Sequence, residues 1–326
     1  MNGFELILPF LRSIQGLILD PDISEIMVNG DERVFIERQG HIEPVANVSL
    51  SQKSLEVAVR NIARRLGDDI SEEKPILDSR LPDGSRVAAV MPPCSLNGVV
   101  LTIRKFNAKR FGMEELMAEG TLTEEVADYL KSAVHGRRNI LIAGATGCGK
   151  TTLLNALSNL ISGHERILII EDTAEIQIEA PNLVRFEARR EQGGLPAVTI
   201  RELLKASLRH RPDRILLGEI RGAEAFDLLQ LLNTGHAGTI STVHANSGAQ
   251  ALSRFTSCVL ESGVELPYRA IKSNIGDSLN ILVHLDRRSG RRFVSEVVEL
   301  KGYNPDLDRY QLTTRFIRME DNSCTR

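Results

Sequence analysis

The hydrophobic positions in the first part of the chain follow two periods. Short runs in which apolar and polar residues alternate predict strands. Leu55, Val59, Ile62 and Leu66 recur at helical spacing, so a helix over residues 51–66 is expected to pack on the sheet. The pattern predicts an α+β amino-terminal domain over residues 1–106. Its expected strands cover residues 26–29, 33–38, 88–91 and 99–103.

An apolar tract near the start is interrupted by Glu5 and Arg12, and no small-residue cleavage site follows it. The tract therefore predicts an amphipathic helix and not a signal peptide. No apolar run approaches the roughly 18 residues that a membrane-spanning helix needs. Phe4, Leu6 and Leu11 leave two interpretations open, which are packing on the core or docking to a partner.

The periodicity lapses over residues 107–120, which we interpret as a linker. Beyond it, apolar strands alternate with amphipathic helices, as a mostly parallel α/β domain over residues 121–326 requires. A capping box of Thr121 and Glu124 is expected to begin a helix over residues 122–135. The expected strands cover residues 139–143, 166–170, 214–218 and 239–243.

Composition narrows the class of protein. A chain of 326 residues, 42% of them hydrophobic, can bury two modest cores, so two domains are the default expectation. The net charge of −3 gives no general electrostatic reason to bind nucleic acid or an anionic membrane. Scattered cysteines support neither a disulfide framework nor a zinc site, and they fit a reducing, cytosolic compartment. These cysteines are Cys94, Cys148, Cys258 and Cys324.

A glycine-rich loop lies between an expected strand and an expected helix. Residues 144–151 fit G-x-x-x-x-G-K-[ST], the Walker A pattern, whose backbone N–H groups cradle phosphates. Lys150 would neutralise the β- and γ-phosphates of ATP, and Thr151 would be a ligand of Mg²⁺. The thiol of Cys148 is expected to point away from the phosphates. The expected ATP contacts are Gly144, Ala145, Thr146, Gly147, Cys148, Gly149, Lys150, Thr151, Thr152, Glu171 and Asp172.

Acidic residues follow two of the expected strands. Glu171, Asp172 and Glu175 come after one strand, and Glu219 comes after another. Parallel strands present such ends at one sheet edge, where a carboxylate can hold Mg²⁺ or orient a water molecule. Either motif alone is also compatible with simple helix capping. His244 ends a further strand, and a lone histidine there is often structural.

The order and spacing of these motifs resemble the secretion ATPase superfamily of type II and type IV secretion and of type IV pili. The resemblance covers the phosphate loop, an acidic box at residues 171–175, a Walker B motif at residues 215–221 and a histidine box that ends at His244. Segments at residues 22–30, 80–87 and 101–106 extend it over nearly the whole chain. Residues 290–296 are most similar to the conjugative-transfer branch of type IV secretion.

The resemblance implies a RecA-like P-loop NTPase domain in a homohexameric ring, with ATP held between the two domains. It implies that Arg86 and Arg104 reach the phosphates, although surface ion pairing is the alternative. It also makes Glu175 the water-activating carboxylate, Glu219 the metal-side carboxylate and His244 a γ-phosphate sensor, with the two carboxylate roles exchangeable. The implied partners are inner-membrane components of a secretion machine. A cytoplasmic location, with peripheral association at the inner face of the membrane, would follow.

Other functions remain open at this stage. Pilus assembly and type II secretion share the same motifs. A small-molecule kinase leaves the amino-terminal domain unexplained. A DNA translocase would need an aromatic nucleic-acid surface, whereas the chain has no tryptophan, so sequence-specific nucleic-acid binding is not expected. A nucleotide-gated scaffold would carry the same motifs. The charged tract at residues 185–194 fits a solvated loop or a subunit boundary.

Overall fold

The chain folds as two units, built mainly from Met1–Lys109 and from Arg110–Arg190 with Pro196–Arg326. The computed structural model describes residues 3–30, 33–38, 40–46, 48, 50–106, 111–191 and 195–318. Three features named above fall partly or wholly outside these residues. They are residues 107–110 of the expected linker, residues 192–194 of the charged tract, and Cys324.

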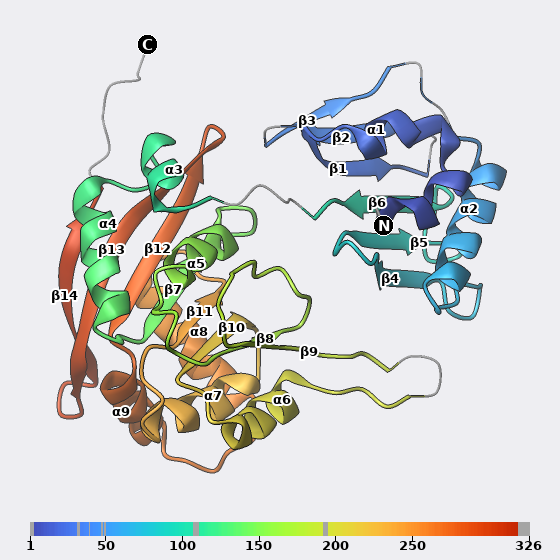
Figure 1. Ribbon diagram of the computed structural model, residues 1–326. Coiled ribbons are helices and arrows are strands. Elements are labelled where there is room, and N and C mark those ends of the chain that lie inside the picture. The colour runs from blue at the N-terminus through green and yellow to red at the C-terminus, as the bar shows by residue number, and fades with distance from the viewer. Residues whose placement is uncertain are drawn as a thin grey trace. The chain divides into compact units, whose positions relative to one another are not determined.

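An antiparallel sheet forms the centre of the first unit, with the strand order β3-β2-β1-β6-β5-β4 (Figure 1). The four expected strands are confirmed as β1, β2, β5 and β6. Two further strands carried little apolar signal, because β3 is exposed along its length and β4 buries one residue fully. The strands are β1 Ile23–Val28, β2 Val34–Arg38, β3 His41–Pro44, β4 Ile76–Arg80, β5 Arg86–Val90 and β6 Val100–Arg104.

The expected helix over residues 51–66 is confirmed as α2, Gln52–Arg65. The hydroxyl of Ser51 caps it by accepting from the backbone N–H of Ser54, which satisfies one orphan donor. Leu55, Val59 and Ile62 are fully buried in the core of the first unit. Burying each such side chain contributes roughly 1.5–3 kcal/mol.

The prediction of one amphipathic helix at the start of the chain is wrong. The segment forms the 3₁₀ turns η1 Gly3–Leu6, η2 Leu8–Phe10 and η3 Arg12–Ile14, followed by the short helix α1 Gln15–Leu19. Pro9 accounts for part of the difference, because it has no N–H for a continuous α-helical ladder and is tolerated in the first turn of η2. Phe4 and Leu11 are buried in the core of the first unit, and Leu6 packs against it. Packing on the core, one of the two interpretations, is therefore confirmed for these side chains.

The second unit contains a mostly parallel sheet with the order β14-β13-β12-β7-β11-β10-β8-β9 (Figure 1). The pairs from β12 to β9 are parallel, and the β12-β13-β14 meander is antiparallel. The expected strands at residues 139–143, 166–170, 214–218 and 239–243 are confirmed. The strands are β7 Ile140–Gly144, β8 Ile167–Glu171, β9 Leu183–Glu187, β10 Arg214–Ile220, β11 Ile240–Val243, β12 Ile281–Arg288, β13 Arg291–Asn304 and β14 Arg309–Ile317.

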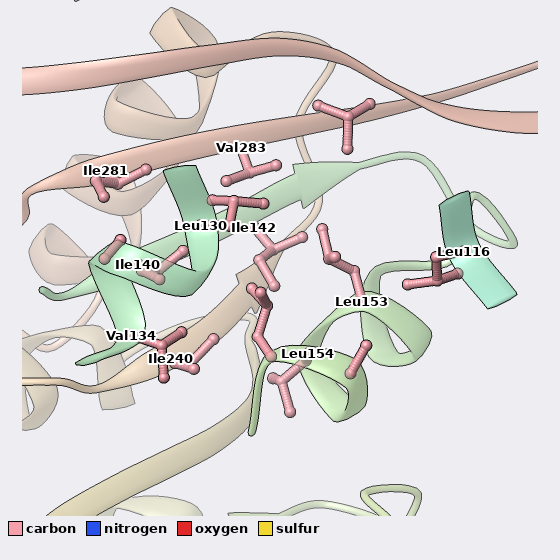
Figure 2. Packing of buried hydrophobic residues seen from close by; sticks show 14 of the residues in the cluster. Leu116, Leu130, Val134, Ile140, Ile142, Leu153, Leu154, Ile240, Ile281 and Val283 are labelled. Carbon is pink, nitrogen blue, oxygen red and sulfur yellow. The ribbon is translucent and has the colours of Figure 1, made fainter. Parts of the chain in front are cut away.

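Helices cover both faces of this sheet, because its central strands are apolar on both sides. Ile140 and Ile142 of β7 join one core cluster, and Leu141 and Ala143 join the other. Figure 2 shows the first cluster, where Ile142 lies among residues of α5 and β12. The helices are α3 Met113–Ala118, α4 Glu124–His135, α5 Lys150–Ser158, α6 Ile200–Ser207, α7 Glu224–Asn233, α8 Gly248–Leu260 and α9 Tyr268–Ser278.

Two details at the entry to this unit differ from expectation. Helix α4 begins after Thr123, whose hydroxyl accepts from the backbone N–H of Val126, so the capping box of Thr121 and Glu124 is wrong. The carbonyl of Thr121 instead accepts from the N–H of Val294 in β13. Part of the expected linker forms α3, whose Leu116 is buried in the first cluster (Figure 2). In the part of the chain that the structure describes, no helix is long and apolar enough to cross a bilayer.

Candidate nucleotide-binding site

The glycine-rich loop joins the end of β7 to the start of α5. Gly149 has a φ of +98°, a left-handed conformation that costs glycine little, and it forms the N-cap of α5. A Cβ on Gly144 would lie 2.5 Å from Sγ of Cys148 and 2.6 Å from the carbonyl oxygen of Leu285. The loop therefore requires glycine at residue 144. Its backbone N–H groups stand at a helix N-terminus, which favours an anion.

Cys148 points into the core from within this loop. Its side chain is 1% exposed and belongs to the apolar cluster beneath β7. Burial raises the pKa of the thiol, which keeps it protonated and unreactive. The cysteine therefore serves packing.

Lys150, the first residue of α5, is folded back over the loop. Its Nζ donates to the carbonyl oxygens of Gly144 and Ala145, at 3.0 Å each. The same atom lies 3.3 Å from Nδ1 of His244. The residue is 8% exposed, and burial lowers the pKa of its ammonium group. The lysine is thus held by weak, neutral acceptors that an incoming phosphate can replace.

A row of charged and polar side chains extends from Lys150 across the carboxyl edge of the sheet. Nε2 of His244 lies 2.5 Å from Oε1 of Glu219, and Oε2 of Glu219 lies 2.7 Å from Nη2 of Arg221. Nη1 of Arg221 then contacts Oδ2 of Asp172 at 3.2 Å. The four side chains beyond Lys150 lie at or just after the ends of β8, β10 and β11, whose parallel register brings these ends together. We call Lys150, His244, Glu219, Arg221 and Asp172 the strand-end chain.

His244 lies between Lys150 and Glu219. A hydrogen bond from the Lys150 ammonium, which can only donate, requires Nδ1 to accept and leaves the ring proton on Nε2, the nitrogen that faces Glu219. Burial is the largest influence on this residue and lowers the pKa of the imidazole. A neutral ring that links a cation to a carboxylate follows from this arrangement.

Glu171, the last residue of β8, lies beneath this edge. Its Oε1 accepts from the backbone N–H groups of Glu175 and Ile176, at 2.8 Å each. Burial raises the pKa of this carboxyl group to about 7, against the two backbone hydrogen bonds, which lower it. Glu171 therefore shapes the turn that carries Glu175.

Glu175 is the exposed acid of the same segment. Its Oε2 lies 3.5 Å from the hydroxyl of Thr151, which donates to it. In the described ranges it forms no ion pair, whereas Glu219 contacts both His244 and Arg221. The two carboxylates that the sequence left interchangeable therefore have different surroundings.

The hydroxyl and carboxylate oxygens at this edge fit Mg²⁺. Mg²⁺ commonly takes one or two protein ligands and completes its shell with water and substrate phosphates. Thr151 offers a hydroxyl oxygen, and Glu175 and Glu219 each offer a carboxylate, of which Glu175 lies beside Thr151 and Glu219 belongs to the strand-end chain. No group of three or more histidine, cysteine or acidic side chains among the described residues could hold a metal ion alone. The protein's share of such a site is a hydroxyl and a carboxylate.

Sequence reasoning missed three arginines near the loop. The sequence placed Arg221 in the Walker B motif but predicted no role for it. In the structure, its guanidinium forms ion pairs with Glu219 and Asp172. Nη1 of Arg287 lies 3.4 Å from the place of a Cβ on Gly147, and Cδ of Arg292 lies 3.5 Å from that of Gly149. A signal was present, because residues 287–292 place two arginines on each side of a Ser-Gly pair.

Arg86 and Arg104 belong to the first unit. They face each other across β5 and β6. Arg86 forms a two-pronged pair with Asp78, both contacts at 2.7 Å, and Arg104 contacts Glu25 at 3.2 Å. Ion pairing, the alternative considered for both, is present, and their contact with phosphates stays a prediction.

The fold and the phosphate loop together define the class of protein to which the second unit belongs. A buried strand, a glycine-rich loop and a helix that begins with lysine, on a sheet of this order, make the second unit a RecA-like P-loop domain. Residues 11–306 match the family described as Type II/IV secretion system protein. The chain belongs to this family.

Relatives agree with the match. The chain is 35% identical over 308 residues to the conjugal transfer protein TrbB of Rhizobium radiobacter, covering 93% of this chain and 91% of that protein. It is 35% identical over 315 residues to the type IV secretion system protein PtlH homolog of Bordetella bronchiseptica, covering 89% and 93%. The X-ray structure of the Legionella pneumophila ATPase DotB shares the fold, with a TM-score of 0.62 and 20% identity over 88% of this chain and 79% of that one.

Proposed function

We propose that this protein binds ATP with Mg²⁺, hydrolyses it, and acts as a motor subunit of a type IV secretion or conjugal transfer apparatus. The observation that carries the proposal is the strand-end chain, which starts at the lysine of the phosphate loop. The family description covers type II and type IV systems. Relatives named for conjugal transfer and type IV secretion favour the type IV branch over pilus assembly or type II secretion.

Lys150 has the central role in binding. A polyphosphate in the loop offers charged oxygens, which are stronger acceptors than the two carbonyls that now hold its ammonium. When Lys150 turns to the β- and γ-phosphates, Nδ1 of His244 loses its donor. His244 thereby reports the γ-phosphate to Glu219, which fits the sensor role that the resemblance implies.

Glu175 is the candidate that activates water. It is exposed, it lies beside Thr151, and no ion pair among the described residues occupies its oxygens. Glu219 is instead balanced by Arg221 and His244, so it suits a fixed position on the metal side. Thr151 and Glu219 would hold Mg²⁺, which would supply positive charge against the charge that develops on the phosphates. The proposal therefore assigns Glu175 to the water and Thr151 with Glu219 to the metal.

The remaining parts of the proposal concern assembly. Arg86 and Arg104 would neutralise the transferred phosphoryl group in a homohexameric ring, where an always-charged guanidinium suits that task. The ring would work in the cytoplasm, docked on inner-membrane components of the secretion machine. The family and its relatives support the link to a secretion machine. The ring, its location and the roles of the two arginines rest on the sequence resemblance.

ATP turnover per protomer, measured against protein concentration in Mg²⁺ buffer, tests the proposal. Lys150→Ala is the control for contaminating ATPases, and Lys131→Ala, an exposed lysine on α4, is the matched control. Turnover that rises with concentration, is lost in Lys150→Ala and is retained in Lys131→Ala would support an oligomeric ATPase. Removal of Mg²⁺ with a chelator should abolish it.

Other outcomes discriminate among the alternatives. Turnover that persists in Lys150→Ala would contradict the assigned site. Stable ATP binding without turnover, even with the membrane components added, would instead favour a nucleotide-gated scaffold.

A further inference from the structure

A basic pocket lies at the tip of the β12–β13 hairpin, in the second unit. Its volume is about 270 Å³. Four arginines, one aromatic ring and one carboxylate line it. They are Arg288, Arg291, Arg292, Arg318, Phe293 and Glu119.

Two of the four arginines are already engaged. Arg318 stacks on Phe293, with its guanidinium carbon 4.8 Å from the ring centre, and donates to the carbonyl of Gly120. Arg288 pairs with Asp286 at 2.9 Å. The side chains of Arg291 and Arg292 form no hydrogen bond or ion pair within the described part of the chain. The pocket therefore presents two planar cations to a ligand.

Arg292 connects this pocket with the phosphate loop. Its Cδ lies 3.5 Å from the place of a Cβ on Gly149, and it also lines the pocket. Arg287, directly opposite Arg292 in the β12–β13 ladder, approaches Gly147 in the same way. Arg292 thus lies between the pocket and the loop, which are neighbours.

Sheet order gives the direction in which a nucleotide must lie. β7 carries the phosphate loop, with β11 on one side of it and β12 on the other. His244 and Glu219 are the side chains that we assign to the γ-phosphate end. His244 follows β11, and Glu219 lies near the end of β10. A nucleotide whose γ-phosphate points to β11 must extend its other end toward β12, where the pocket lies.

We propose that this pocket receives the base and ribose of the bound ATP. Guanidinium planes stack well on nucleobases, and among the described residues Arg291 and Arg292 have no hydrogen-bond or ion-pair partner to leave. The carboxylate of Glu119 can accept hydrogen bonds from a ribose hydroxyl or from the amino group of the base. This inference rests on the proposed function, because it presupposes that the loop binds ATP.

Comparison of ATP with inorganic tripolyphosphate separates the pocket from the loop, since tripolyphosphate has neither base nor ribose. Dissociation constants of both would be measured by titration calorimetry with Mg²⁺, using the full chain. Arg291→Gln and Glu119→Gln remove one pocket group each without leaving a buried charge. Arg209→Gln, an exposed arginine after α6, is the matched control. Thermal unfolding checks that each variant is folded.

The expected result is selective. Arg291→Gln should weaken ATP about tenfold, as the loss of one stacking contact predicts, and leave tripolyphosphate unchanged. Glu119→Gln should also weaken ATP alone, and Arg209→Gln should change neither ligand. Unchanged ATP affinity, or an equal loss for both ligands, would overturn the inference. If the unmodified protein bound neither ligand, the proposed function itself would fail.

Discussion

Charges at the strand ends are arranged differently in the two units. In the first unit they form small local groups, such as the pair of Arg104 with Glu25 and the contacts of Arg38 with Asp20, Asp22 and Glu43. In the second unit, the strand-end chain joins five side chains into one continuous series that begins at the phosphate loop.

The difference follows from sheet topology. Antiparallel neighbours place opposite ends of successive strands at one edge, so a charge meets its partner across one ladder. Parallel strands bring several carboxyl ends to the same edge, so charges accumulate there and must share partners. A change in one member of a shared series affects the others, whereas a change in a separate pair stays local.

The largest effect is expected when the series is interrupted at its centre. Glu219→Gln removes the charge that balances Arg221 and faces His244, so ATP turnover should fall at least about 100-fold. Steady-state turnover at saturating ATP measures this. Glu56→Gln, which breaks an i,i+4 pair with Arg60 on α2, is the control and should keep normal turnover. Equal losses in both variants would remove the contrast between the units.

A pH-dependent effect is expected at Glu171. Its pKa of about 7 in the folded chain exceeds the usual 4.5, so the stability that it contributes is complete below pH 4.5 and is lost as the pH rises through 7. Glu171→Gln stays neutral and should remove this loss. Relative to the unmodified protein, the variant should gain on the order of 1–3 kcal/mol of unfolding free energy between pH 4.5 and pH 8.

Urea unfolding at both pH values measures the change at Glu171. The difference in unfolding free energy between Glu171→Gln and the unmodified protein should be larger at pH 8 than at pH 4.5. An equal difference at the two pH values would mean that the pKa of Glu171 is not raised in the folded chain, which would contradict the prediction.

A smaller effect is expected at Lys272, which lies away from the phosphate loop. Its Nζ lies 5.2 Å from the ring centres of Tyr268 and Tyr303, 5.6 Å from that of Tyr310, and 2.6 Å from Oδ1 of Asp308. Lys272→Met should cost about 1–2 kcal/mol of unfolding free energy, because those contacts join α9 to β13 and β14.

Chemical unfolding measures the stability of Lys272→Met. Its ATP turnover, measured at denaturant concentrations too low to unfold it, should be normal. Lys131→Met on α4 is the control for the loss of a surface charge. A large loss of turnover in a folded Lys272→Met variant would mean that charges in the second unit are coupled beyond the strand-end chain.

The smallest effect is expected for a separate pair. Glu25→Gln breaks the contact with Arg104, whose side chain is 57% exposed, so the loss of unfolding free energy should stay below about 1 kcal/mol. High salt should reduce the difference further. A loss of several kcal/mol, measured by urea unfolding, would show that the first unit also depends on a shared network.

Local signals in the sequence predicted much of the second unit. The phosphate loop needs glycines and a lysine at fixed spacing, and its flanking strands are apolar runs, so both were predicted from neighbouring residues alone. The end of each parallel strand marked Glu171, Glu219 and His244 as candidates. All three lie at the expected sheet edge.

The features of the site and fold that the sequence did not predict depend on contacts between residues far apart in the chain. No spacing distinguishes a buried Glu171 that holds a turn from an exposed Glu175 beside Thr151, because their difference arises from packing against Gly218 and the backbone. Arg287 and Arg292 approach the loop because β12 pairs with β7, a register that joins residues far apart in the chain. The exposed strand β3 had no apolar pattern to reveal it.

The hold of the loop on its own lysine has a consequence for selectivity in a crowded mixture of anions. The ammonium of Lys150 already contacts two carbonyl oxygens and a ring nitrogen. An anion that binds to it must replace these contacts, so the net gain in free energy is only the difference between the new contacts and the old ones. Under the proposed function, a lone orthophosphate would contact few N–H groups and would gain little by that exchange. A triphosphate would contact the loop at several points and replace the internal contacts together. The loop would then favour triphosphates over small, abundant anions.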